Sequence, residues 1–159
     1  MPDNDQGIGW LWGDTEAVMA SPHPDATIRK GDLVWLTRDC RHIRPVSEHQ
    51  GSALCSVQWV ISRFLGVALQ ANRWGRDAQG ALLRVATAGV FGFSALPGDY
   101  LLGDLLVPAL RASEVPDDPR LCNQQVQLAL TNDPGIAQVV FPTTNACHVR
   151  AAVRSAIMR

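Results

Sequence analysis

The sequence predicts an all-β fold, either a β-sandwich or a small β-barrel of about eight short strands with an extended N-terminal arm. Three observations lead to this prediction. Glycine (13 residues) and proline (10 residues) are spread along the 159-residue chain, as expected for many short elements joined by turns. Apolar runs of strand length recur roughly every ten residues. Within several runs, polar and apolar residues alternate with the period of a half-buried strand.

Residues 1–27 form the expected arm, and residues 28–159 form the β domain. The arm is rich in glycine and proline, both of which oppose a helix. Trp10 and Trp12 alternate, so an extended backbone places both indoles on one side. Because tryptophan is enriched at interface hot spots, we expect them to be buried either against the chain's own core or in a neighbouring subunit.

The β domain is expected to consist of short strands joined by polar loops. Strands are predicted at residues 33–37, 57–61, 64–69, 81–93, 99–110, 125–131, 136–141 and 147–158. The longest loops are expected at residues 38–53 and 111–123, which are polar and contain proline.

Residues 54–70 are the most ambiguous part of this prediction. Val57, Trp59 and Ile61 share one parity, which favours a strand, and a helix is the alternative for this first half. The second half is apolar and contains Gly66, which marks a bulge or a close approach of another backbone.

A short sequence echo links two turns of the predicted domain. Gly31-Asp32 is followed by Leu-Val, and Gly103-Asp104 is followed by Leu-Leu. The echo is compatible with two similar β-motifs. Four residues are little evidence for an internal repeat, so this reading stays open.

Composition favours a protein that binds other proteins over one that binds nucleic acid or membrane. Charged residues make up 18% of the chain, below the usual quarter, so part of the surface is expected to be covered by partners or taken up by a large core. The net charge of −1 gives no basic footprint for nucleic acid. No window approaches the roughly 18 apolar residues of a membrane span, and no signal-peptide pattern is present.

The two ends of the sequence differ in charge. Residues 1–20 carry four acidic residues and no Lys or Arg, whereas residues 148–159 carry three arginines, among them Arg150 and Arg154, and no acid. This polarity suits head-to-tail contacts between subunits, with chance in short windows as the alternative. Trp10, Trp12, Arg150 and Arg154 are therefore our candidate residues for a subunit interface.

The search for a catalytic nucleophile identifies no supported site. Cys40 with His42, and Cys55 or Cys147 with His148, are the conceivable thiol–imidazole pairs. A thiolate site also needs an oxyanion hole and an orienting group, which the sequence does not indicate. The chain is therefore expected not to be an enzyme. With no CxxC pair and no secretion signal, the four cysteines are expected to be buried thiols.

The remaining polar residues have ordinary structural explanations. Asp32, Asp99 and Asp104 lie in Gly-flanked turns, where aspartate is a common turn former. The four histidines lack ligand spacing, so neither a metal nor another cofactor is expected. Arg73, Trp74 and Arg76 form only a small basic-aromatic group, best explained as a solvated turn.

The order of the motifs resembles a known family. The order is GDLVWL (31–36), a polar loop, FLGVALQ (64–70), LRVATAGVFGF (83–93), YLLGDLLVPAL (100–110), VQLAL (126–130), IAQVVF (136–141) and HVRAAVRS (148–155). It is similar to the small β-rich decoration, or cement, proteins of tailed-bacteriophage heads. The resemblance covers about residues 28–155 and rests mainly on this order, since each motif alone is a strand with a glycine turn.

The resemblance implies a non-enzymatic virion protein on the capsid surface, made in the host cytoplasm. Its partners would be the major capsid protein and further copies of itself, often as a trimer. This chain departs from the simplest members in its long first segment with two tryptophans and in its four cysteines. A spike base or another minor virion protein, a β-rich ligand- or carbohydrate-binding module suggested by the five tryptophans, and a small Cys/His hydrolase remain as alternatives.

Overall fold

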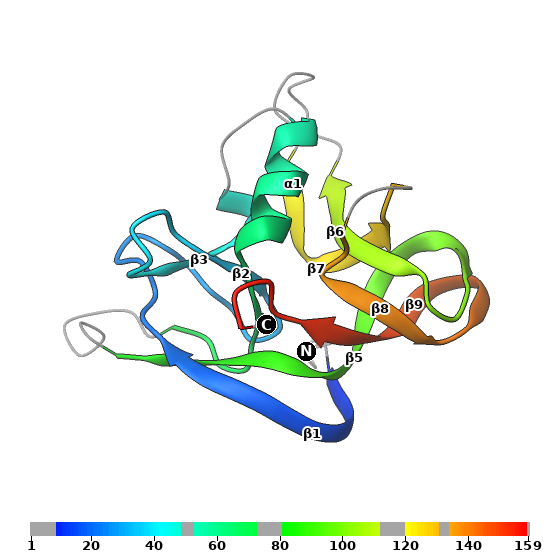
Figure 1. Ribbon diagram of the computed structural model, residues 1–159, viewed down its shortest axis with the longest axis horizontal. Helices are drawn as coiled ribbons and strands as arrows, with labels where there is room; N and C mark the ends of the chain where they lie inside the picture. The colour runs from blue at the N-terminus through cyan, green and yellow to red at the C-terminus, as the bar shows by residue number, and fades with distance from the viewer. Residues whose placement is uncertain (1–8, 49–52, 73–80, 112–119, 131–133, 159) are drawn as a thin grey trace, which may run out of the picture.

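The protein has the all-β fold that the sequence predicts, with 60% of the described residues in strands. The computed structural model describes residues 9–48, 53–72, 81–111, 120–130 and 134–158, with the backbone alone for 9–14, 53–57 and 111 (Figure 1). Within these residues, no helix has the length and apolar character needed to cross a membrane.

Nine strands, one α-helix and one short 3₁₀ helix make up the described chain. In order they are β1 Gly9–Ala20, β2 Leu33–Leu36, β3 Ile43–Pro45, η1 Val46–Glu48, α1 Ala53–Arg63, β4 Phe64–Ala68, β5 Leu83–Tyr100, β6 Leu105–Arg111, β7 Arg120–Leu128, β8 Ala137–Phe141 and β9 Thr143–Arg154.

Five strands close into a barrel that contains the main core. The second half of β5 pairs with β9, β9 with β8, β8 with β6, β6 with β7, and β7 with β5. Phe91, Phe93 and Ala95 alternate along β5 and point inward, where they join Leu106 and Val149 in one buried cluster. This barrel forms the right-hand part of Figure 1.

The extra strands form a second, smaller ring with the first half of β5. β1 pairs with β5, β5 with β4, β4 with β2, and β2 with β3. The ring closes where the amide of Ile43 donates to the Ser21 carbonyl at 2.9 Å and the amide of His23 donates to the Ile43 carbonyl at 3.0 Å. A separate core cluster that includes Ile28, Val34 and Val85 belongs to this ring.

Both rings have the same strand connections. In each, the first strand pairs with the fifth, the second with the third and the fourth, and the fourth with the fifth. The first and third strands meet in parallel, through Pro22 and Ile43 in one ring and through Ser94–Ala95 and Gln125–Val126 in the other. β5 is the fifth strand of one ring and the first strand of the other.

The Gly-Asp echo marks equivalent turns of the two rings. Gly31 and Gly103 both have φ of 91°, a left-handed conformation that favours glycine. The Asp32 carboxylate accepts a hydrogen bond from the Arg29 amide at 2.7 Å, and the Asp104 carboxylate accepts one from the Leu101 amide at 2.8 Å.

Each of these turns is also tied to the strand beside it. The amide of Gly31 donates to the Ala68 carbonyl and the amide of Gly103 to the Val139 carbonyl, at 2.7 and 3.0 Å. The amides of Ala68 and Val139 donate back to the carbonyls of Asp32 and Asp104, at 2.8 and 2.9 Å. The structure therefore supports the interpretation of the echo as two similar β-motifs.

Three sequence predictions need correction. Residues 53–63 form α1 rather than a strand, and the adjacent residues Val60 and Ile61 are both buried on its inner side. The expected loop at 38–53 contains β3 and η1, and residues 120–123 of the expected second loop belong to β7.

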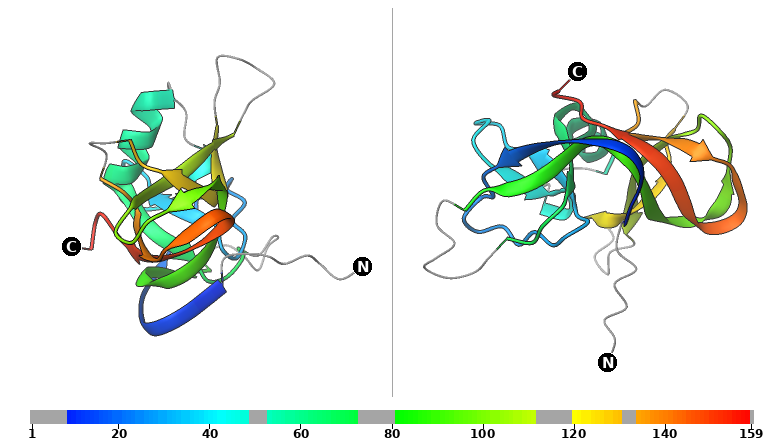
Figure 2. Two further views of the ribbon diagram at one scale, coloured as in Figure 1. Left: turned by 90° about the vertical axis from the view of Figure 1, so that its right-hand side faces the viewer. Right: turned by 90° about the horizontal axis from the view of Figure 1, so that it is seen from below.

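Part of the expected arm is extended and pairs within its own chain. Residues 9–20 form β1, which runs antiparallel along β5 with several breaks in register. Figures 1 and 2 show β1 on the outer side of β5, at the edge of the molecule. Residues 1–8 lie outside the described residues.

We expect Gly66→Ala to destabilise the fold strongly. A Cβ atom at Gly66 would lie 1.8 Å from the carbonyl oxygen of Ala86, so β4 and β5 would have to separate. Overpacking of this kind costs about 1–3 kcal/mol or more. Gly98→Ala is the matched control, because the nearest atom to its new Cβ is 3.9 Å away. Urea unfolding measures both, and equal midpoints for the two variants would contradict the close approach of the strands.

Candidate functional site

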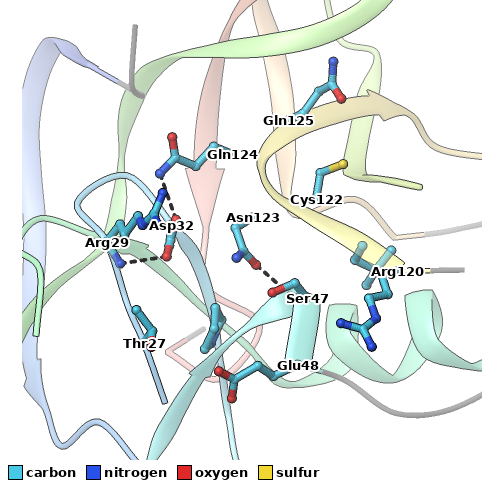
Figure 3. Close-up of a pocket in the computed structure, with 12 residues that line it drawn as sticks. Thr27, Arg29, Asp32, Ser47, Glu48, Arg120, Cys122, Asn123, Gln124 and Gln125 are labelled. Carbon is cyan, nitrogen blue, oxygen red and sulfur yellow. Dashed lines mark hydrogen bonds between the residues drawn. The ribbon is translucent and has the colours of Figure 1, made fainter. Parts of the chain in front are cut away.

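A polar pocket of about 620 Å³ lies between the two rings. Its walls come from the turn before β2, from β3 and η1, and from the first half of β7 (Figure 3). The lining residues are Thr27, Arg29, Asp32, Pro45, Ser47, Glu48, Arg120, Leu121, Cys122, Asn123, Gln124 and Gln125.

The pocket exists because β7 leaves the ladder that it forms with β6. Leu110 opposes Leu121 and Pro108 opposes Val126, so one residue of β6 faces four residues of β7. Such an irregularity bends a strand and redirects its side chains. The displaced segment, residues 122–125, forms one wall of the pocket.

Side-chain amides of this displaced segment connect the two rings. The Oδ1 of Asn123 accepts a hydrogen bond from the Ser47 amide at 2.8 Å. The Nε2 of Gln124 donates to Oδ1 of Asp32 at 2.8 Å and to the Lys30 carbonyl at 3.2 Å. The pocket wall is therefore fixed by hydrogen bonds to the turn and to η1.

Asp32 is the most unusual titratable group of the pocket. The residue is 2% exposed, and burial raises the pKa of its carboxyl above 3.8, against the opposing effects of hydrogen bonds from the Arg29 backbone and Gln124 and of the Arg29 charge. Both carboxylate oxygens already accept hydrogen bonds. This arrangement fits the turn-forming role predicted for Asp32.

Glu48 also has a partner on the protein. Its carboxylate lies 2.6 Å from one guanidinium nitrogen of Arg44, and the other terminal nitrogen of Arg44 lies 2.8 Å from Nδ1 of His23. Both carboxylates of the pocket are thus engaged by neighbouring groups.

A second feature, which sequence reasoning missed, is a group of exposed apolar side chains at one end of the barrel. We refer to it as the apolar end; it consists of Leu101, Leu102, Leu105, Leu128, Leu130 and Phe141. The strand pairings place the backbones of these residues at one end of the barrel, because Leu106 opposes Leu128, Leu105 opposes Gln138, and Tyr100 opposes Thr143. In Figure 1 the turns that follow β5 and β8 lie on the same side of the molecule.

Leu101 and Leu102 are highly exposed members of the apolar end, as is Leu130. They are 63% and 69% exposed, although the turn that carries them is held by hydrogen bonds to β8. The equivalent turn of the other ring has the charged residues Arg29 and Lys30 at the same two places. The turn conformation therefore does not require leucine at either position.

The four predicted interface residues all lie on strands that flank β5. Trp10 and Trp12 oppose Phe91 and Val90 from β1, with their side chains outside the described structure. Arg150 and Arg154 oppose Gly92 and Ala88 from β9, on the other edge of β5, and are exposed. Within the described side chains, the guanidinium of Arg150 lies 5.3 Å from the ring centre of Phe141, next to the apolar end.

Cys40 and His42, one of the candidate thiol–imidazole pairs, lie in the loop that connects β2 and β3. A guanidinium nitrogen of Arg63 contacts Sγ of Cys40 at 3.3 Å and the Thr37 carbonyl at 2.5 Å. The ring of His42 packs edge-on against that of His23, with ring centres 5.4 Å apart. Asp39, fully exposed, has a lowered pKa, mainly because the Thr37 hydroxyl donates a hydrogen bond to it.

The prediction that the cysteines are buried is wrong for two of them. Cys40 is exposed because it lies in a turn with φ of 56°, and Cys147 is exposed on β9 beside His148. Cys122 is partly buried in the pocket wall, and the side chain of Cys55 lies outside the described structure.

The remaining candidates from the sequence are metal-binding clusters and residues that lie outside the described structure. Within the described residues, no group of three or more His, Cys, Asp or Glu side chains is placed to hold a metal ion. His49 and the Arg73, Trp74 and Arg76 group lie outside the described residues.

The pH dependence of stability should report the burial of Asp32. Since its folded-state pKa is raised, the folded state binds this proton more tightly than the unfolded state does. The favourable contribution is complete below the unfolded pKa of about 3.8 and is lost as pH rises through the folded pKa. We expect the stability of Asp32→Asn relative to the wild type to increase over this window and then level off.

Chemical unfolding at a series of pH values measures this difference. Asp104→Asn makes the same chemical change in the equivalent, more exposed turn and controls for loss of the turn's hydrogen bond. If the stability of Asp32→Asn minus that of the wild type stays constant or falls as pH rises, Asp32 is not held in this way.

No family model matches the sequence, and no match was found among curated proteins. The functional argument therefore rests on the residues and geometry of the chain itself.

Proposed function

We propose that this chain is a non-enzymatic structural protein of a virion, with a decoration or cement role on the capsid. In this role it binds the major capsid protein and further copies of itself, in a symmetric oligomer such as a trimer, and stabilises the capsid lattice. The resemblance in motif order suggests the role, and the all-β fold is compatible with it.

The observation that carries the proposal is the exposure of Leu101 and Leu102 on a fixed turn. Burial of apolar surface against a partner is favourable by about 25 cal/mol of free energy per Å². The equivalent turn has Arg29 and Lys30, which shows that solvated side chains are compatible with the same backbone. Contiguous exposed apolar surface on a small protein commonly marks a protein interface.

The other residues of the apolar end strengthen this argument. Leu105, Leu128 and Leu130 surround the turn, and Phe141 adds an aromatic ring beside Arg150. Aromatic and arginine side chains are typical of interface hot spots. A lattice protein also gains from avidity, because modest contacts repeated over many subunits sum to stable attachment.

The pocket favours a second candidate function, that of a β-rich ligand-binding module. Its volume of about 620 Å³ falls within the usual range for small ligands, about 300–1,000 Å³. Among the described residues, its lining contains no aromatic ring on which a sugar could stack. The pocket therefore favours a polar ligand over a carbohydrate, and the experiment below separates this candidate from the first.

We expect the double variant Leu101→Lys/Leu102→Lys to bind capsids at least tenfold more weakly than the wild type. The measurement is co-sedimentation with capsids assembled from the major capsid protein of the same source. Since both side chains are exposed, stability should change by only about 0.5 kcal/mol each. Leu82→Lys, at an exposed leucine outside the apolar end, is the matched control and should bind normally.

Two outcomes would contradict the proposal at different levels. If the wild-type chain does not sediment with capsids, the decoration role is wrong. If the wild type and the double variant sediment equally, the apolar end is not the contact surface.

A further inference from the structure

We propose that His23 makes the closure of the smaller ring sensitive to pH, so that protonation of its Nδ1 atom opens the junction between the end of β1 and β3. This inference concerns the isolated protein and does not depend on the virion role. It rests on the hydrogen bonds that Nδ1 accepts, on the charged groups around it, and on the backbone hydrogen bonds that close the ring.

The hydrogen bonds at Nδ1 of His23 fix its protonation state in the closed ring. A terminal guanidinium nitrogen of Arg44 lies 2.8 Å from this atom, and the backbone amide of Asp25 donates to it at 3.2 Å. Neither group can accept a hydrogen bond, because guanidinium and backbone N–H groups are donors only. Nδ1 must therefore present its lone pair here, and a proton on it would require both donors to move away.

The charges around His23 favour the same outcome. Arg44 is the nearer and more buried charge, since its side chain is 25% exposed, whereas the Asp25 carboxylate is 86% exposed and 3.9 Å away. Solvent screens this exposed attraction more than the partly buried repulsion. Glu48 offsets part of the Arg44 charge, and at 2.6 Å it also keeps the guanidinium in place beside His23.

A second histidine adds to this effect. The rings of His23 and His42 meet edge to face, with ring centres 5.4 Å apart. The Asp39 carboxylate lies 3.6 Å from Nδ1 of His42 and is largely exposed. Histidine gains its proton between about pH 8 and 5, so both rings can become charged in the same range. Since like charges repel, double protonation is unfavourable while the two rings remain in contact.

The junction beside these rings is held by backbone hydrogen bonds to a single residue of β3. The amide of Ile43 donates to the Ser21 carbonyl at 2.9 Å, its carbonyl accepts from the His23 amide at 3.0 Å, and Pro22 opposes it in an isolated bridge. His23 thus closes the ring through its amide and contacts Arg44 of β3 through its imidazole. A displacement of this side chain from Arg44 acts on the same backbone segment that closes the ring.

Proton binding at one histidine is large enough to change the opening of this junction measurably. If only the open junction binds the proton, the equilibrium constant for opening is multiplied by about 1 + 10^(6.5 − pH), since the ordinary pKa of histidine is about 6.5. This factor is about 1.1 at pH 7.5 and about 11 at pH 5.5. The parallel junction of the larger ring is formed by β5 and β7 instead, so we expect the opening to stay within the smaller ring.

Hydrogen exchange of backbone amides in the full chain tests the inference. The Ile43 amide donates across the junction and should lose protection about tenfold between about pH 7.5 and 5.5, after correction for the pH dependence of intrinsic exchange. The Val139 amide donates to the Asp104 carbonyl in the larger ring at 2.9 Å. It is the internal control and should keep its protection.

Two matched variants separate His23 from the other histidines. In His23→Asn the side-chain oxygen can accept from Arg44 in place of Nδ1 but cannot be protonated, so the protection of Ile43 should no longer fall with pH. His148→Asn makes the same change at an exposed histidine on β9 and should respond as the wild type does.

A measurement on the wild type serves if His23→Asn fails to fold. The ¹⁵N chemical shifts of the imidazole ring of His23 at neutral pH should show Nδ1 without a proton. This readout reports the hydrogen-bonding role of the ring directly and needs no substitution.

Four results would overturn the inference. Unchanged protection of Ile43 over this pH range would remove the switch. A full response in His23→Asn would assign the response to another group. Equal loss of protection at Ile43 and Val139 would show that acid unfolds the whole protein instead of opening the junction. A proton on Nδ1 of His23 at neutral pH would contradict the hydrogen bonding on which the switch depends.

Discussion

The fold depends on one strand, β5, which belongs to both rings. Over residues 88–92 it pairs with β1 on one edge and with β9 on the other, so its backbone is hydrogen-bonded on both sides. Its first half contributes Leu83 and Val85 to the smaller core, and its second half contributes Phe91 and Phe93 to the larger one. The larger cluster also includes Leu33 and Val67 of the smaller ring, so the two rings are joined by packing as well as by the continuous strand β5.

The two Gly-Asp turns show how one backbone design serves two different surfaces. The glycine with positive φ, the aspartate that accepts an amide hydrogen bond, and the exchange with the adjacent strand are the same in both. Their side chains differ: Asp32 is buried under Gln124 beside charged neighbours, whereas Leu101 and Leu102 project into solvent. Since the hydrogen bonds carry the structural role, the remaining side chains are available for binding. Because the backbone and the aspartate form the turn without the other side chains, the same turn motif borders a polar pocket in one ring and carries an apolar surface in the other.

Sequence reasoning predicted the strands well, because each buried run has β-branched or alternating residues between glycine turns, as in GDLVWL and IAQVVF. It failed at α1, because Val57, Trp59 and Ile61 fit the period of a strand although the segment is a helix, and the burial of Val60 beside Ile61 is visible only in the packed structure. The pocket was not predictable, because it depends on a register break between β6 and β7 that arises from tertiary pairing. The run Asn123-Gln124-Gln125 was its only local signal. The apolar end could have been found from the sequence. The two Gly-Asp turns have Arg29–Lys30 in one and Leu101–Leu102 at the same places in the other.

β7 contributes to both candidate surfaces, and its pairing keeps them apart. Its first half is displaced from the ladder and lines the pocket, and its end carries Leu128 of the apolar end. Between them, Val126, Gln127 and Leu128 keep regular register with Pro108, Val107 and Leu106, and Val126 is fully buried. A change at residues 122–125 would have to break these pairs and move a close-packed core residue to reach the apolar end. The pocket and the apolar end are therefore structurally independent, since a change in the wall of one does not reach the other without disturbing the buried core.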